Sequence, residues 1–324
     1  MSYTLKTNIS NKNNYGRTRK ITSINYIVIH YTSNDGDSDE SNSNYFKRNI
    51  GASAHYFVDD DSITQSVPDN YVAWSVGGSK YNDCNITGGG KYYNKCINAN
   101  SLSIELCDTN KNGVVYPTQA TIDNAIEFCK FKMVQYGIDK SHVIRHFDVN
   151  GKHCPEYWCC NASKNELWKT EFWDKLSGWA LYDSDWYWLD NNGNITKSQW
   201  VQSNGKWYYL SDCGKLITNQ WIKNATGTWS YVNCNGEAVT GWSKLSWNGI
   251  ENWYYFDENG NMLISTWIND NGKDYYLTSS GAMATNAYVQ SKSQSIYYWV
   301  GDDGAWQQEW NTSYPDFSKY KVVV

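Results

Sequence analysis

The sequence predicts an α/β domain with a central mixed sheet flanked by helices, followed by an all-β hairpin-repeat solenoid. Strand and helix patterns alternate up to about residue 176, which is typical of a layered α/β domain. Aromatic clusters then recur about every 21 residues to the end of the chain. The composition changes at the same point, because all 5 His precede residue 154 and 14 of the 18 Trp follow residue 178. We therefore expect a reactive domain over residues 1–176 and a recognition domain over residues 177–324.

The elements of the front half follow from local patterns. A continuous β-branched run predicts a buried strand over residues 24–31. Further strands are expected at 52–59, 63–67, 100–107 and 142–145, and a short helix at 41–49. Apolar residues at helical spacing predict helices at 118–136 and 163–175. Residues 71–76 and the Gly88–Gly90 loop are expected to form a cleft wall.

Composition excludes several classes of function. Residues 178–324 hold 9 Lys and 14 Asp or Glu, which accounts for the whole net charge of −5. A nucleic-acid-binding domain would need a basic patch, so we expect no nucleic-acid partner. No apolar run approaches the ~18 residues of a membrane span, so we expect no membrane insertion. The first ten residues lack the apolar segment of a secretory signal, and the odd number of Cys, 9, favours reduced thiols.

A group of metal-ligand residue types lies in one loop after a short apolar strand. His146, Lys152 and Cys154 fall within nine residues, and His30 ends the apolar run 27–29. Imidazole and thiolate are preferred zinc ligands, and a catalytic zinc keeps three protein ligands. His30, His146 and Cys154 are therefore candidate ligands, although a His and a Cys this close in sequence are more often unrelated residues.

Glu105 is the second candidate for chemistry, because it stands between Ile104 and Leu106 in a predicted strand. A carboxylate inside an apolar strand is costly unless it is paired or lies near a metal. The alternative is a Glu at the edge of the strand that faces water.

Four motifs in order resemble those of the zinc-dependent N-acetylmuramoyl-L-alanine amidases, which share a fold with the peptidoglycan recognition proteins. They are residues 28–32 (VIHYT), 53–59 (SAHYFVD), 100–106 (NSLSIEL) and 146–155 (H-x5-K-x-C-P). The resemblance covers about residues 20–175. It implies a Zn²⁺ cofactor and cleavage of the amide between N-acetylmuramic acid and L-alanine in peptidoglycan.

Carried over to this chain, the resemblance implies zinc on His30, His146 and Cys154. Lys152 would stabilise the developing oxyanion, and Glu105 would be the acid or base that moves the proton of water to the leaving amine. Several relatives have a catalytic Tyr at the position aligned with His55. Either His55 or the adjacent Tyr56 could take that role.

The back half contains six repeat units and the start of a seventh. An aromatic residue opens each unit at intervals of 21–25 residues, an aromatic cluster follows it, and a turn Gly follows the cluster. A unit of this length is one hairpin, which is marginal alone, so stacked units are expected to bury many of these aromatics structurally. The exposed aromatics are expected to form cages that bind quaternary ammonium groups or stack on sugars.

These units resemble the choline-binding, or cell-wall-binding, repeats of Gram-positive lysins, with residues 240–242 and 253–262 as the best match. Tyr288, Ser230 and the insertion at 244–252 depart from the pattern, so the number of working sites and the identity of the ligand stay open. The resemblance implies binding to teichoic acid or another wall polymer, which can carry choline. The candidate ligand-binding residues are Trp200, Trp207, Tyr209, Trp221, Trp229, Trp242, Trp253, Tyr255 and Trp267.

The sequence as a whole therefore predicts a peptidoglycan amidase with a C-terminal wall-anchoring solenoid. We expect a phage endolysin that is made in the host cytoplasm and reaches the wall to lyse the cell. The alternatives are a secreted bacterial autolysin, a non-catalytic peptidoglycan-binding protein, and a hydrolase of a different wall bond. The last repeats, residues 299–310, could also support a homodimer.

Overall fold

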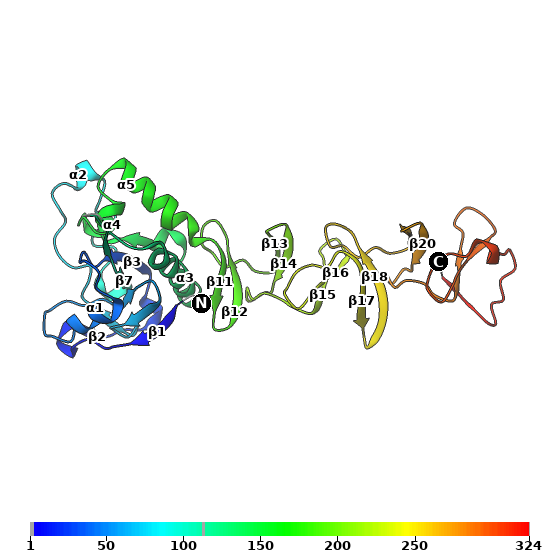
Figure 1. Cartoon of the computed structure of the whole chain (residues 1–324), viewed down its shortest axis with the longest axis horizontal. Helices are drawn as coiled ribbons and strands as arrows, with labels where there is room; N and C mark the ends of the chain where they lie inside the picture. The colour runs from blue at the N-terminus through cyan, green and yellow to red at the C-terminus, as the bar shows by residue number, and fades with distance from the viewer. Residues whose placement is uncertain (1–2, 112–113, 324) are drawn as a thin grey trace. The chain divides into compact units, whose positions relative to one another are not determined.

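The computed structural model describes residues 3–111 and 114–323 of the chain. The chain divides into two compact units (Figure 1). The first unit comprises residues 1–197 and 212–215, and the second comprises residues 198–211 and 216–324. Within the described ranges, no helix is long and apolar enough to span a membrane.

A six-stranded sheet forms the centre of the first unit (Figure 1). Its strands, in spatial order, are β1 (Thr4–Thr7), β5 (Ser62–Gln65), β4 (Tyr56–Val58), β7 (Ser101–Leu106), β3 (Tyr26–Tyr31) and β10 (Val143–Arg145). Only the β4–β5 pair is antiparallel, and the other neighbours run parallel. The predicted mixed sheet is therefore confirmed.

Short elements surround this sheet. Two small strand pairs join β2 (Tyr15–Thr18) to β6 (Tyr71–Ala73) and β8 (Thr109–Lys111) to β9 (Val114–Tyr116). The shorter helices are α1 (Asp39–Tyr45), α2 (Cys84–Thr87), α4 (His146–Asn150) and α5 (Ala162–Leu167). The helix predicted at 163–175 is irregular, since α5 continues as a π-helical turn (Trp168–Phe172) and a 3-10 turn (Trp173–Leu176).

The longest helix, α3 (Gln119–Tyr136), lies where its sequence pattern predicts it. The Thr118 side chain accepts a hydrogen bond from the backbone N–H of Thr121, which caps the first turn. Gly137 ends the helix in the left-handed conformation, with φ of 65°. Its buried face, which includes Ile122 and Met133, belongs to the same core as the central strands.

The repeats form two-stranded antiparallel hairpins. They are β11–β12 (Gly178–Tyr182, Asp185–Leu189), β13–β14 (Gln199–Ser203, Lys206–Leu210), β15–β16 (Gln220–Lys223, Trp229–Val232), β17–β18 (Gly241–Trp247, Ile250–Phe256), β19–β20 (Thr266–Asp270, Lys273–Leu277) and β21–β22 (Ala287–Gln290, Tyr297–Val300). A last strand, β23 (Lys321–Val323), pairs with β21. These hairpins confirm the predicted all-β repeat region.

The first hairpin, β11–β12, belongs to the first compact unit. Ala180, Tyr187 and Leu189 are buried in the same hydrophobic core as α3 and the sheet. Gly193, just after the hairpin, lies so close to the Lys140 backbone that a Cβ would come within 2.6 Å of its nitrogen. The hydrophobic core of the first unit therefore includes the first repeat hairpin.

Candidate metal centre

The three predicted zinc ligands come from three separate chain segments and meet at one point. His30 lies near the end of β3, His146 is the first residue of α4, and Cys154 lies in the loop that follows α4. Parallel pairing of β3 with β10 brings their ends together, because Ile29 lies opposite Arg145 and each is followed by a candidate His. All three side chains are buried, and their ligand atoms lie within 4.8 Å of one another.

Two of the three distances between the ligand atoms are close to those in a tetrahedral zinc site. The two Nδ1 atoms of His30 and His146 are 3.1 Å apart, and Cys154 Sγ lies 3.8 Å from His30 Nδ1. Usual Zn–N and Zn–S lengths give edges of roughly 3.4 Å between two nitrogens and roughly 3.6 Å between nitrogen and sulfur. Two imidazoles and a thiolate, with a fourth position left for water or substrate, are a donor set typical of catalytic zinc.

Burial keeps both imidazoles in the neutral form that binds metals. Burial first, and then the nearby Lys152 charge, lowers the pKa of His146 to about 3. Burial and the His146 ring lower the pKa of His30 well below its usual value. Burial raises the pKa of the Cys154 thiol, so a metal ion would have to displace its proton.

Glu105 lies next to the candidate ligands because β7 pairs with β3 in a register that places Glu105 opposite His30. Its Oε1 is 3.8 Å from His30 Nδ1, and the side chain is 17% exposed. Burial raises the pKa of Glu105 to about 8, although the Lys152 charge opposes this effect. Glu105 is therefore a partly accessible carboxyl beside the ligand cluster, and the alternative of a Glu facing bulk water is wrong.

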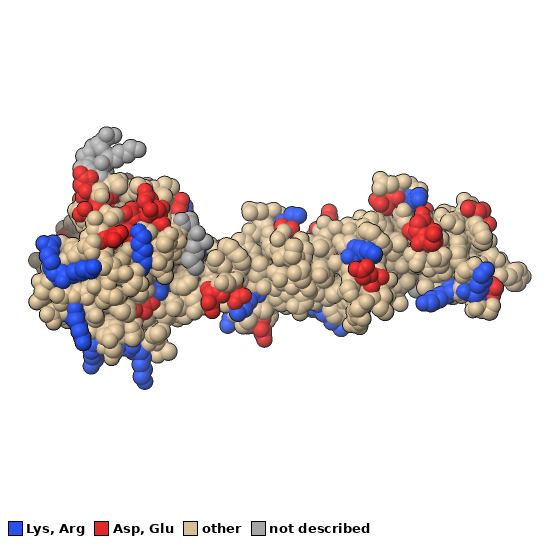
Figure 2. Space-filling model, turned by 60° about the horizontal axis from the view of Figure 1, so that its bottom comes forward, with Lys and Arg blue, Asp and Glu red and all other residues tan. Residues whose placement is uncertain are grey.

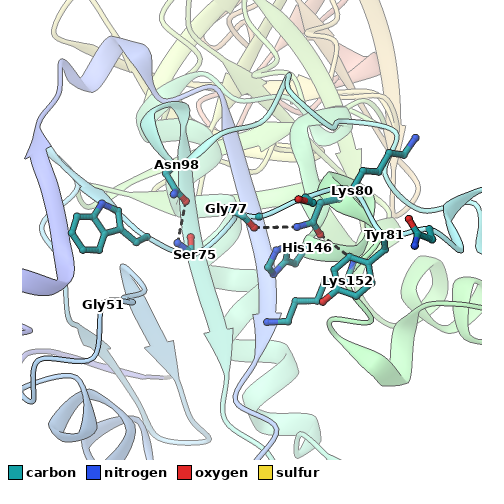
Figure 3. Close-up of a pocket in the computed structure, with 13 residues that line it drawn as sticks. Gly51, Ser75, Gly77, Lys80, Tyr81, Asn98, His146 and Lys152 are labelled. Carbon is teal, nitrogen blue, oxygen red and sulfur yellow. Dashed lines mark hydrogen bonds between the residues drawn. The ribbon is translucent and has the colours of Figure 1, made fainter.

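A cavity of about 760 Å³ opens beside His146 (Figure 3). Lys152 is exposed and lies in its wall with His146, as Figure 3 shows. The cleft wall predicted at 71–76 contributes Trp74 and Ser75. The following residues 77–82 line the cavity, whereas the Gly88–Gly90 loop is not part of its wall.

The loop that carries Lys152 and Cys154 is held by polar contacts within α4 and the preceding strand. The Arg145 guanidinium donates to both carboxylate oxygens of Asp148, at 2.9 and 2.8 Å, and to the Trp158 carbonyl. The Phe147 N–H donates to the Cys154 carbonyl at 2.9 Å. These bonds fix the two ends of the loop relative to each other.

Gly151 allows the chain to turn between His146 and Cys154. Its φ is 91°, and a Cβ at this position would lie 2.2 Å from the Cys84 sulfur. Only glycine combines this conformation with such a close approach.

His55 lies apart from the cavity wall and is fully buried. Its Nδ1 accepts the Ser103 N–H at 3.0 Å, and its Nε2 lies 2.9 Å from an Arg19 nitrogen. The Tyr56 hydroxyl is also buried and donates to Asp69 at 2.5 Å. The structure therefore places both candidates for the additional catalytic role in a polar network inside the sheet domain.

The structure divides the candidate wall-binding aromatics among several local clusters. Trp200, Trp207 and Tyr209 line a cavity of about 450 Å³, and Trp229 lines a second of about 580 Å³. Trp267 lines a third, of about 320 Å³. The others pack against aromatic neighbours: Trp221 on Tyr231, Trp247, Tyr254 and Phe256; Trp242 on Tyr255 and Tyr275. Trp253 is 43% exposed.

Sequence reasoning missed three residues of the third cavity, which are Asp274, Tyr298 and Trp306. Tyr298 belongs to the next hairpin, and Trp306 follows a turn Gly. Counting from the cross-strand aromatic pairs places Asp274 and Tyr298, whereas only the fold brings Trp306 to this cavity.

Comparisons with known proteins found matches for both halves of the chain, in agreement with the families that the sequence motifs predict. Residues 20–157 match the family model of N-acetylmuramoyl-L-alanine amidases. Residues 177–195, 198–216 and 247–262 match a cell wall binding repeat, and residues 271–306 match a choline-binding repeat. The chain is 30% identical over 151 residues to the N-acetylmuramoyl-L-alanine amidase CwlL of Bacillus licheniformis, which covers 45% of this chain and 39% of the relative. The chain thus spans about two fifths of the length of that relative.

Two solved structures are also similar to parts of the chain. A mutant endolysin from Bacillus subtilis is 23% identical, with a TM-score of 0.41, and covers 54% of this chain and 99% of its own. Choline binding protein F from Streptococcus pneumoniae is 34% identical, with a TM-score of 0.33, and covers 41% of this chain and 40% of its own. The family matches, with the motifs and hairpins described above, show that the chain joins a domain of the N-acetylmuramoyl-L-alanine amidase family to choline-binding repeats.

Proposed function

We propose that the chain is a zinc-dependent peptidoglycan hydrolase that cleaves the amide between N-acetylmuramic acid and L-alanine. The observation that carries this proposal is the convergence of His30, His146 and Cys154 beside Glu105 and an open cavity. The family match of residues 20–157 supports the same bond specificity.

His30, His146 and Cys154 would hold the zinc ion. Zinc, when bound there, supplies Lewis acidity toward water and toward the carbonyl of the scissile amide. Glu105 would take a proton from the attacking water and deliver it to the leaving amine of L-alanine. Its pKa of about 8, raised by burial, suits a group that both accepts and releases a proton near neutral pH.

Lys152 would bind the negative charge that develops on the carbonyl oxygen. Its ammonium is exposed in the cavity wall, close enough to His146 to lower the pKa of that imidazole. A fixed positive charge where the oxyanion forms stabilises the transition state more than the neutral substrate. The substrate would occupy the cavity lined by Trp74, Asn98 and Asn150, whose aromatic and amide groups suit a glycopeptide.

We further propose that the repeats bind a wall polymer, such as a teichoic acid, through cationic groups like choline. Aromatic side chains line three cavities in the second unit, and aromatic faces attract organic cations. Figure 2 shows charged side chains of the repeats in small separate groups on one face, with wide uncharged surface between them. On this face, the aromatic cavities are therefore better candidates for binding than a broad charged surface.

Digestion of purified Gram-positive cell walls tests the hydrolase proposal. New free L-alanine amino ends, formed without new reducing sugar ends and suppressed by a zinc chelator, are the expected result. New reducing ends would instead indicate a glycosidase. Tight wall binding without any new ends would indicate a non-catalytic binding protein.

The biological setting is also a proposal. We propose a phage endolysin that acts on the wall from the host cytoplasm, and a holin gene beside the coding sequence is the expected observation. A bacterial operon without phage genes would favour an autolysin. Homodimer formation through residues 299–310 is tested by the mass of the full chain in solution.

A further inference from the structure

Each repeat hairpin contains a cross-strand pair of aromatic residues. Equivalent positions in different hairpins can be found by their distance along the chain from this pair. In three successive hairpins, the paired Trp of the first strand packs against a Tyr in the second strand of the next hairpin. That Tyr directly precedes the aromatic residue of the next cross-strand pair. The ring centroids are 5.0 Å apart for Trp221 and Tyr254, 5.3 Å for Trp242 and Tyr275, and 5.9 Å for Trp267 and Tyr298. Successive hairpins thus build the same kind of aromatic corner from different residues.

The corner at Trp267 is closed by a third ring. Trp306 lies with its ring centroid 6.4 Å from Trp267 and 6.0 Å from Tyr298. The planes of the three rings meet at 62° to 89°, so the rings face a common space from different sides. That space is a cavity of about 320 Å³, and all three rings are partly exposed. We refer to it as the Trp267 cage.

The Trp267 cage differs from its equivalents in its fourth wall, which is Asp274. Asp274 stands two residues before Tyr276, the cross-strand partner of Trp267. In each of the three preceding hairpins, the second-strand Tyr of the cross-strand pair also has a residue two positions before it. That residue is a Trp in every case: Trp207, Trp229 and Trp253. Among these four hairpins, only the one that carries Trp267 has a carboxylate instead of an indole at this position.

The Asp274 carboxylate is held in place but is not neutralised by a cation. One of its oxygens accepts a hydrogen bond from the Asn269 side-chain amide at 2.7 Å, and its backbone carbonyl accepts the Trp306 N–H at 2.8 Å. The neighbouring Lys273 pairs instead with Asp303, at 3.2 Å. Across residues 3–111 and 114–323, no Lys, Arg or His forms an ion pair with Asp274.

A carboxylate and an aromatic wall recognise different ammonium groups. A quaternary ammonium has no N–H and gains most from aromatic faces. A primary ammonium donates N–H groups, and a hydrogen bond between two charged groups is roughly twice as strong as a neutral one. A primary ammonium also loses more hydration on burial, so it needs such an acceptor.

We propose that the Trp267 cage binds a primary ammonium group of the cell wall, and that Asp274 sets this preference over a quaternary ammonium. The inference rests on the proposed wall-binding function of the repeats and names the ligand class of one site. The amine can come from an amino sugar or from an amino acid esterified to a wall polymer.

Titration of the full chain with ethanolamine and with choline tests this assignment, since the two differ only in the methylation of nitrogen. The indole N–H of Trp306 donates to Asn311 Oδ1 at 2.9 Å and gives a local NMR signal, which Trp306→Phe assigns. We expect this signal to respond to ethanolamine with a dissociation constant about tenfold or more below that for choline, the effect of a hydrogen bond between charged groups.

Two variants separate the carboxylate from the rest of the cage. Asp274→Asn keeps the shape, so the affinity for ethanolamine should fall about tenfold or more while the affinity for choline changes little. Asp274→Trp restores the residue of the other hairpins and should reverse the preference. Asp270→Asn removes the same charge from the same hairpin outside the cage wall, and should leave both affinities unchanged.

Three results would overturn the proposal. Tighter binding of choline than of ethanolamine to the native chain would show a quaternary-ammonium site. Wall binding, measured in parallel, would then still support the proposed function of the repeats while this inference fails. An equal loss of affinity for both ligands in Asp274→Asn would show that the carboxylate supports the shape of the cage or attracts any cation, without a preference for N–H groups. A Trp306 signal that responds to neither ligand would remove the cage as a cation site. Glucosamine and alanine methyl ester, titrated in the same way, identify the source of the amine.

Discussion

At the scale of single residues, the candidate metal centre depends on a few side chains whose chemistry would be unfavourable without a metal. The Nδ1 atoms of the buried His30 and His146 rings face each other at 3.1 Å, so a metal ion between them would bind both nitrogens. The Cys154 thiol is also buried. Burial of three such groups within 4.8 Å costs free energy that metal coordination can offset.

The first prediction concerns Cys154, which we expect to be an essential ligand. Cys154→Ser should reduce bound zinc to well below one ion per chain and abolish release of L-alanine ends, because a hydroxyl is a much poorer zinc ligand than a thiolate. Metal analysis and wall digestion measure both effects. Cys159→Ser is the matched control, since Cys159 is also buried in this region but lies outside the ligand cluster. Full activity in Cys154→Ser would contradict the proposed site.

The second prediction separates proton transfer from metal binding. Glu105→Gln should lower the rate of wall hydrolysis by about 10²–10⁴-fold, the usual contribution of a general acid or base. Zinc content should stay near that of the native chain, because Glu105 is not one of the three ligands. Loss of zinc in this variant would instead assign Glu105 a structural role at the metal.

At the scale of elements, the centre depends on how strand register and one tight loop bring distant segments together. Pairing of β3 with β7 sets Glu105 opposite His30, and a shift by one residue would turn Glu105 to the other face of the sheet. The α4 loop then returns Cys154 toward His30 through Gly151.

The third prediction is that Gly151→Ala disrupts this loop. Its added Cβ would collide with the Cys84 sulfur in a conformation that also strains an L-residue, so zinc affinity and activity should both fall. Gly137→Ala is the control, because Gly137 also has a positive φ but no atom lies within 4 Å of its Cβ position. That variant should cost only about 1 kcal/mol of stability and keep the zinc. Equal zinc loss in both variants would contradict the steric argument.

At the scale of the whole molecule, the chain forms two compact units: the first holds the candidate metal centre and the first repeat hairpin, and the second holds the remaining hairpins. The first repeat hairpin contributes to the core of the first unit, so that unit extends beyond the family match at 20–157.

The fourth prediction follows from the role of Leu189 in this core. Leu189→Ala should destabilise the first unit by about 2–5 kcal/mol, the usual cost of a buried Leu truncation. Leu210→Ala is the matched control, because Leu210 holds the equivalent position of the second hairpin and is equally buried, in the second unit. Thermal inactivation of the hydrolase measures the difference. Equal inactivation of the two variants would contradict the assignment of β11–β12 to the first unit.

The fifth prediction concerns the pH dependence of stability. Burial, and then the Arg19 guanidinium, lowers the pKa of His55 to about 3, whereas an unfolded His has a pKa of about 6.5. Between these values the unfolded chain binds more protons. The free energy of unfolding should therefore decrease as pH falls below about 6.5, by up to about 1.4 kcal/mol per pH unit from His55, and this contribution should be constant above that pH.

Urea unfolding at pH 7.5 and pH 5.0 measures this effect. His55→Gln should show a smaller loss of stability between the two pH values than the native chain. An unchanged difference would mean that His55 does not contribute to the pH dependence.

The sequence by itself determined the order of the two architectures, the longest helix and the identity of the metal-ligand candidates. Hydrophobic periodicity and the Thr118 and Gly137 signals are local, so they were sufficient for α3. The spacing of aromatic residues was likewise sufficient for the hairpins, because each hairpin is a local structure.

Only the tertiary structure decided which distant residues share a site. Strand order brings His30, Glu105 and His146 together, and no local pattern specifies that order. His55 resembles a catalytic residue in its motif, yet the fold buries it among Ser103 and Arg19. The Trp267 cage contains side chains from more than one hairpin, so the proposed role of Asp274 depends on the aromatic rings that the fold places around it. The physical reason is that coordination, cation binding and desolvation depend on distances across the fold, whereas sequence patterns report mainly local conformation.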